Sequence, residues 1–77
     1  MSRLTEAERR ALQAVADGKV TRVYTQEGNT MHSAAGNGAR TLWALARKEL
    51  ITDGPSTGNY YVTCTQVLTK EGRAALK

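Results

Sequence analysis

The chain contains little of several residue types, and each shortage excludes a class of protein. Among its 77 residues there are one cysteine, one proline, one tryptophan and no phenylalanine. A lone cysteine, Cys64, cannot form an intrachain disulfide, which predicts a reducing compartment such as the cytoplasm. The longest apolar run is the five residues of Leu42–Ala46, which is far shorter than the ~20 residues of a membrane-spanning helix. No membrane association is therefore expected.

The small size of the chain limits the chemistry that it can support. We expect a single domain, residues 1–77, with a small core and no deep catalytic pocket. Cys64 and His32 are the single representatives of their types, so no cluster of thiols and histidines can form at metal-ligand spacing. We therefore expect no enzyme activity, no metal site and no cofactor.

Positive charge is concentrated in the middle of the chain. Residues 18–48 hold five cations and one anion, whereas the charges of the remaining residues balance. The net charge of +4 therefore belongs to this segment. It favours an anionic partner, and a solvated surface without any partner is the alternative explanation.

Apolar residues at helical spacing predict two helices. Residues 4–17 carry Thr5 and Glu8 at the spacing of a capping box, and Gly18 is suited to end this helix in a left-handed conformation. Residues 37–50 carry a second apolar stripe, with Asn37 as the expected N-cap and most of the cations outside the stripe.

The segment 19–35 permits two interpretations. Its first part, KVTRVYTQ, is rich in β-branched residues and favours a strand, and Glu27–Gly28–Asn29 is a turn signal. The segment forms either a β-hairpin through Gly28–Asn29 or a strand followed by a short helical stub at residues 30–35.

The C-terminal part predicts a hairpin and a short helix. TDGPSTGN, residues 52–59, is dense in turn-forming residues and is expected to be the tip of a hairpin that spans residues 51–68. YYVTCTQVL, residues 60–68, alternates as a strand does, and its parity places Cys64 on the buried side. Thr69 is expected to cap a last helix over residues 69–77, in spite of the helix penalty of Gly72.

The order and spacing of these segments resemble the bacterial winged helix-turn-helix family. In that family the recognition helix ends in a leucine-x-x-x-glycine-leucine-isoleucine phrase, and the last strand runs into leucine-threonine-x-x-glycine-x-x-x-leucine. Residues 45–51, LARKELI, match the first phrase with Glu49 in place of glycine, and residues 68–76, LTKEGRAAL, match the second. The resemblance covers roughly residues 37–76. It implies an α+β fold, a small winged helix with three helices and a two- or three-stranded antiparallel sheet. The middle helix of the family has no good counterpart here, so we expect it to be reduced or replaced by a β-hairpin.

The resemblance also implies a DNA-binding surface. The helix over residues 37–50 would enter the major groove, and its expected DNA contacts are Asn37, Arg40, Thr41, Ala44, Arg47 and Lys48. Arg40 is suited to a bidentate contact with guanine. Contacts with phosphates and from the wing are expected from Lys19, Arg22, Gly38, Thr57, Asn59 and Tyr61. Trp43, beside the apolar stripe, is expected to pack against the core or a hairpin rather than to contact a base.

The predicted function is sequence-specific binding of double-stranded DNA by a small transcriptional regulator of a bacterium or phage. Such a regulator acts by occupying an operator in the bacterial cytoplasm or the phage-infected host. One module of this size offers a small interface, so homodimerisation or cooperative binding is expected. Two alternatives remain open, which are a protein-interaction module that binds an acidic host or polymerase partner and an excisionase-like architectural DNA binder.

Overall fold

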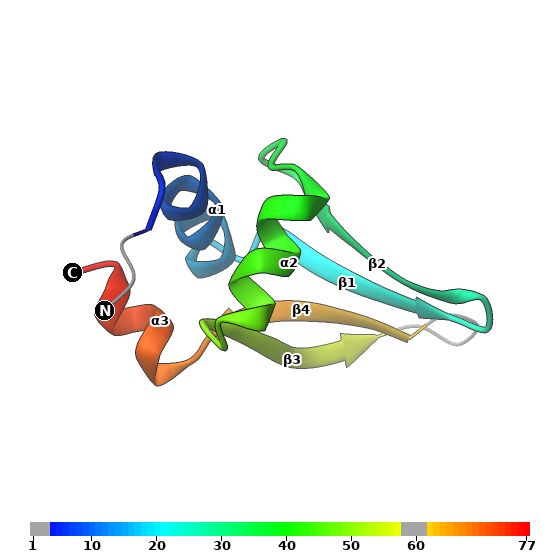
Figure 1. Cartoon of the computed structure of the whole chain (residues 1–77). Helices are drawn as coiled ribbons and strands as arrows, with labels where there is room; N and C mark the ends of the chain where they lie inside the picture. Colours follow the sequence, from blue (N-terminus) through cyan, green and yellow to red (C-terminus); the bar gives the residue numbers. More distant parts are fainter. Residues whose placement is uncertain (1–3, 58–61) are drawn as a thin grey trace.

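The protein is built on an antiparallel sheet that is crossed on one face by a helix (Figure 1). The computed structural model describes residues 4–57 and 62–77. Along these residues the elements follow the order α1 (Glu6–Ala16), β1 (Val20–Thr25), β2 (Gly28–Ser33), α2 (Ala39–Arg47), β3 (Ile51–Thr57), β4 (Val62–Leu68) and α3 (Lys70–Ala75). The strands lie in the order β2-β1-β4-β3 with antiparallel neighbours. The α+β class is confirmed, whereas the described residues form four strands in place of the two or three expected.

Helix α1 is shorter than the predicted 4–17, but it is capped by the residues that the sequence indicated. The Thr5 hydroxyl accepts from the Glu8 N–H at 3.1 Å, and the Glu8 carboxylate accepts from the Thr5 N–H at 2.9 Å, so the capping box is confirmed. Gly18 has a φ of +74°, which is the left-handed conformation expected after the helix.

The segment 19–35 forms the β-hairpin of the two interpretations, and the alternative of a helical stub is wrong. Strands β1 and β2 pair over six residues each, from Val20↔Ser33 to Thr25↔Gly28. The turn lies at Gln26–Glu27 rather than at Gly28–Asn29. It lies there because the Thr25 hydroxyl donates to the Gly28 carbonyl at 2.9 Å and accepts from the Glu27 N–H at 3.3 Å.

Helix α2 is shorter than the predicted 37–50. Its N-cap is Gly38, not Asn37, because the Asn37 side chain instead accepts a hydrogen bond from the Ser33 hydroxyl at 2.8 Å. The helix stops at Arg47, and Glu49 then adopts a φ of +60°. Glu49 stands where the winged-helix phrase has glycine, and its left-handed backbone explains why glycine would suit this position.

Residues 52–57 of the predicted hairpin tip belong to strand β3, and residues 58 and 59 of that prediction lie outside the described residues. The predicted tip is wrong because Gly54 and Pro55 fall where the β3–β4 register shifts, between Asp53 and Ser56. Strand β3 is an edge strand, where a proline without an N–H is tolerated at a bulge.

Helix α3 is fixed by Thr69 and Gly72. The Thr69 hydroxyl donates to the Glu49 carbonyl at 2.7 Å and accepts from the Gly72 N–H at 3.1 Å, so its capping role is confirmed. A Cβ at Gly72 would lie 2.1 Å from the Leu50 carbonyl oxygen. This close approach is the reason that a glycine lies inside α3.

The core lies between the helices and one face of the sheet. Leu12 of α1, Leu42 and Leu45 of α2, and Val20 of β1 are fully buried there. Side chains alternate along a strand, so every second residue from Val20 onward, together with its partners on the other strands, points to this side. We call it the helix face of the sheet. The residues whose side chains lie on the helix face include Arg22, Tyr24, Met31, Asp53, Cys64 and Gln66.

Candidate nucleic-acid interface

The solvent-facing side of α2 carries cations and no acidic residue. Its sequence, ARTLWALAR, turns Leu42 and Leu45 into the core and leaves Arg40 and Arg47 exposed. These two arginines are seven residues apart, so they share one side of the helix with a rise of about 10 Å between them. Ala44 lies between them and is half-buried, as is Thr41. We call Arg40, Trp43, Ala44 and Arg47 the α2 surface.

Arg22 reaches the α2 surface from β1 and is held in one orientation. Its guanidinium carbon lies 4.6 Å from the centre of the Trp43 ring and 4.7 Å from that of Tyr24. Its Nε donates to the Asn29 side-chain oxygen at 3.1 Å. Among the described residues no carboxylate lies within ion-pair distance of it, and its two terminal amino groups make no hydrogen bond. Arg22 is thus a planar donor fork with its position already fixed, which suits binding of a phosphate or a base edge.

Trp43 both packs on the core and supports Arg22. The ring is half-buried and lies against the core cluster, as the sequence predicted. Its stacking with Arg22 was not predicted, and neither were the roles of Tyr24 and Asn29. One signal for this arrangement is present in the sequence, because Arg22 and Tyr24 are two residues apart on a strand and therefore share a face.

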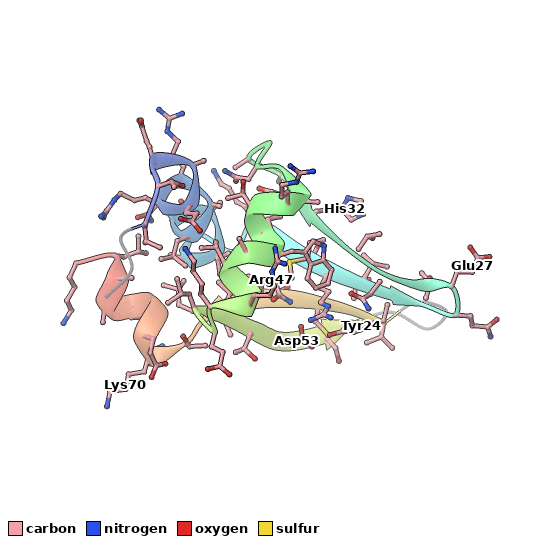
Figure 2. The ribbon with its side chains drawn as sticks, in the orientation of Figure 1. Tyr24, Glu27, His32, Arg47, Asp53 and Lys70 are labelled. Atoms are coloured by element: carbon pink, nitrogen blue, oxygen red, sulfur yellow. The ribbon has the colours of Figure 1, made fainter. Side chains whose placement is uncertain are left out.

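Next to Arg22, three strands are joined by a polar network. The Tyr24 hydroxyl donates to Asp53, and the Gln66 side chain donates to the other Asp53 oxygen at 2.7 Å. These hydrogen bonds hold the pKa of Asp53 below its ordinary value, and the bond to Asp53 raises the pKa of Tyr24. Figure 2 shows Arg47 on α2 and Tyr24 and Asp53 on the sheet in the same region of the molecule. In this network the Asp53 carboxylate accepts hydrogen bonds from two neutral groups, the Tyr24 hydroxyl and the Gln66 amide.

Lys48 does not belong to the α2 surface. Its Nζ lies 2.7 Å from the Glu8 carboxylate of α1, and the Lys48 side chain is 35% exposed. The hydrogen bond from Lys48 holds the pKa of Glu8 below its ordinary value. Lys48, which the sequence assigned to a DNA contact, thus joins the two helices in this structure.

The remaining predicted residues that the structure describes lie near the start of α2 or at the end of β3. Lys19 is exposed, and its carbonyl accepts from the Ala34 N–H at 2.8 Å, which places it beside the loop that leads to α2. Gly38 caps α2 without a side-chain hydrogen bond, so its first N–H groups receive no side-chain acceptor. Thr57 ends β3, and the predicted contacts Asn59 and Tyr61 lie outside the described residues.

An acidic hollow limits the α2 surface at the C-terminal end of the helix. It has a volume of about 500 Å³ and is lined by Arg22, Ala46, Glu49, Ile51, Thr52, Asp53, Gln66, Thr69 and Glu71. Its charged lining consists of three carboxylates and the guanidinium of Arg22. Within the part of the chain that the structure describes, no group of acidic, histidine or cysteine side chains is arranged to hold a metal ion.

The chain was compared with protein-family models, with curated proteins and with solved structures, and none of them matches. Among the described residues no helix is long and apolar enough to cross a membrane.

Proposed function

We propose that this protein binds double-stranded DNA through the α2 surface and Arg22. The observation that carries the proposal is the alignment of Arg40 and Arg47 on one side of α2 with a pre-oriented Arg22 beside them. Three guanidinium groups without an ion-pair partner among the described residues provide what a phosphate backbone requires.

The positions of the arginines assign them to different parts of the DNA. Arg40 lies in the first turn of α2, and residues near the start of a groove-entering helix meet the base edges. Arg22 and Arg47 would then contact phosphates on one side of the groove. Lys19 and the uncapped N–H groups after Gly38 would contact phosphate at the N-terminal end of α2.

The proposed role is a small transcriptional regulator of a bacterium or phage that acts by occupying its operator, with a β-hairpin in place of the family's middle helix. Helix α2 packs against the sheet and against α1, and in such a regulator these elements would supply the support that the middle helix gives in the winged-helix family.

The proposal is tested by the affinity of purified variants for a short random-sequence duplex, measured by fluorescence anisotropy at low salt. Replacing Arg22 or Arg47 by alanine is expected to weaken binding about ten-fold and to reduce the salt dependence by about one contact. Arg22→Lys is expected to weaken it too, because lysine keeps the charge but not the planar fork.

Two control variants locate the interface. Lys70→Ala removes an exposed cation of α3, at the far end of the molecule from the start of α2 (Figure 2), and should leave affinity unchanged. Lys48→Met removes a cation that is engaged with Glu8 and should also leave affinity unchanged. Equal losses from Arg47→Ala and Lys70→Ala would rule out the α2 surface as the binding site.

A further inference from the structure

The acidic hollow at the C-terminal end of α2 has the size of a binding site for a small molecule. Its volume of about 500 Å³ lies within the ~300–1,000 Å³ that ligand pockets occupy. Its walls come from strands β1, β3 and β4, from the last turn of α2 with Glu49 beyond it, and from the first turn of α3. Segments that are far apart in the sequence therefore meet around one space.

A buried amide group opens into this hollow. Gln66 is 1% exposed, and its side-chain nitrogen donates to Asp53 at 2.7 Å. Among the described residues no donor reaches the side-chain oxygen Oε1 of Gln66, although every side-chain oxygen or nitrogen that is sealed from solvent has a partner. The Oε1 atom is therefore accessible, and it faces the hollow because Gln66 lines that space. An almost fully buried acceptor without a donor is a position that an N–H group of a ligand can satisfy.

The charged groups of the hollow differ in whether they already have partners. Asp53 accepts two hydrogen bonds from neutral groups. In the part of the chain that the structure describes, the carboxylates of Glu49 and Glu71 make no hydrogen bond or ion pair, and neither do the terminal amino groups of Arg22. The hollow thus offers two available carboxylates and one available guanidinium.

We propose that the hollow binds a basic amino acid, which is a ligand with one carboxylate and two cationic groups, of the class of free lysine. The planar fork of Arg22 would hold the carboxylate of the ligand. The two ammonium groups would contact the oxygens of Glu49, Glu71 and Gln66. The last turn of α2, with Ala46 at the hollow, presents the negative end of the helix dipole to the same cations.

The set of available groups distinguishes this ligand from simpler ones. A ligand with only anionic groups would leave Glu49 and Glu71 without a partner, and a ligand with only cationic groups would leave Arg22 without one. Lysine supplies a partner to all three charged groups and an N–H donor to the buried Gln66 oxygen.

The site has a consequence for DNA binding, and this consequence alone rests on the proposed function. The Arg22 fork cannot hold the carboxylate of the ligand and a DNA phosphate at the same time, so the two would compete for it. A basic amino acid would then act as an effector that weakens DNA binding. The site itself does not require DNA binding, because Glu49, Glu71 and Gln66 are not part of the DNA interface.

Titration of the full chain with L-lysine, in the absence of DNA, tests the site through the NMR shifts of backbone amides. The largest shifts should fall around the hollow, at Ala46, Gln66 and Thr69. L-norleucine lacks the side-chain ammonium and cadaverine lacks the carboxylate, so each should bind the wild type at least about ten-fold more weakly than L-lysine. Equal affinities for the three compounds, or no saturating shift at the hollow up to about 10 mM L-lysine, would overturn the proposal.

Three isosteric variants locate the carboxylates that bind the ligand. Glu49→Gln and Glu71→Gln should each weaken L-lysine binding about ten-fold. Glu27→Gln removes the same charge from the turn between β1 and β2, at the far tip of that hairpin (Figure 2), and should leave the affinity unchanged. An equal loss in Glu27→Gln would show that only net charge matters and would overturn the site. The comparison of the three compounds on the wild type does not depend on how a variant folds.

A DNA-binding measurement at matched ionic strength separates the site from the proposed function. Saturating L-lysine should weaken duplex binding by the wild type by about the ten-fold expected of Arg22→Ala. Unchanged DNA affinity would overturn the assignment of Arg22 to the ligand. A protein that binds L-lysine in the hollow but binds no DNA would refute the proposed function and support the site, and one that binds DNA without any L-lysine shift would do the reverse.

Discussion

The ion pair between α1 and α2 offers the sharpest test of the packing. The Glu8 carboxylate lies 2.7 Å from Lys48 Nζ through one oxygen and accepts the Thr5 N–H at 2.9 Å through the other. Glu8→Gln keeps an acceptor for the Thr5 N–H and removes the charge that faces Lys48. The side chains are 10% and 35% exposed, so this pair is shielded more than a surface pair and less than a buried one.

The expected loss follows from this intermediate burial. Exposed ion pairs contribute ~0.2–1 kcal/mol, and hydrogen bonds to charged groups contribute ~1.5–3 kcal/mol. We expect Glu8→Gln to lower the free energy of unfolding by about 1–2 kcal/mol. An unfolding entropy of ~2.1 cal/mol/K per residue means that each kcal/mol lowers the Tm of this 77-residue chain by about 6 °C, so Tm should fall by about 6–12 °C.

Urea denaturation of Glu8→Gln, Lys48→Met and the double variant measures the coupling between the two side chains. The coupling free energy should be about 1 kcal/mol. Glu6→Gln is the matched control, because Glu6 pairs with Arg10 at the same 2.7 Å but both side chains are more than 70% exposed. A loss in Glu6→Gln as large as that in Glu8→Gln, or a coupling near zero, would refute the assigned role of Lys48.

Three further predictions concern single positions. Glu49→Gly should raise the free energy of unfolding by about 0.5–1 kcal/mol, because φ is +60° there; urea denaturation against Glu49→Ala, which should show no such gain, checks this. Gly72→Ala should lower it by about 2–3 kcal/mol, because the added Cβ would lie 2.1 Å from the Leu50 carbonyl oxygen; an unchanged Tm would contradict the packing of α3. The folded-state pKa of Asp53 is lowered, so its contribution to stability is complete above about pH 5 and is lost as pH falls through that pKa. The pKa of Tyr24 is raised, so its contribution is lost as pH rises above about 10. Asp53→Asn should reduce the loss of stability both at acid pH and above about pH 10. A free energy of unfolding that depends on pH as in the wild type would show that the hydrogen bonds of Asp53 do not contribute to stability.

Local signals in the sequence predicted the ends of the elements where one side chain decides the backbone. The Thr5–Glu8 capping box and the Thr69 cap are examples, because each hydroxyl satisfies an N–H within three residues of itself. The buried position of Cys64, which is 6% exposed, followed in the same way from strand parity. Such features depend on neighbours in the chain and can be recognised from the sequence.

Features that depend on distant partners were mispredicted or missed. Gly54 and Pro55 were assigned to a turn because turn propensity does not reveal that β4 lies beside them and that a bulge accepts them. The ion pair between Lys48 and Glu8 was missed because the two residues are 40 positions apart in the chain. The position of Arg22 between Tyr24 and Trp43 joins a strand to a helix, and no local pattern contains both rings.

The central claim is that DNA binds the α2 surface with Arg22, and the salt dependence of binding by the wild-type protein tests it most directly. Three cations are assigned to phosphates, namely Lys19, Arg22 and Arg47. The logarithm of the association constant for duplex DNA should therefore fall against the logarithm of salt concentration with a slope of about −3. The absence of binding at low salt, or a slope near zero, would contradict the claim.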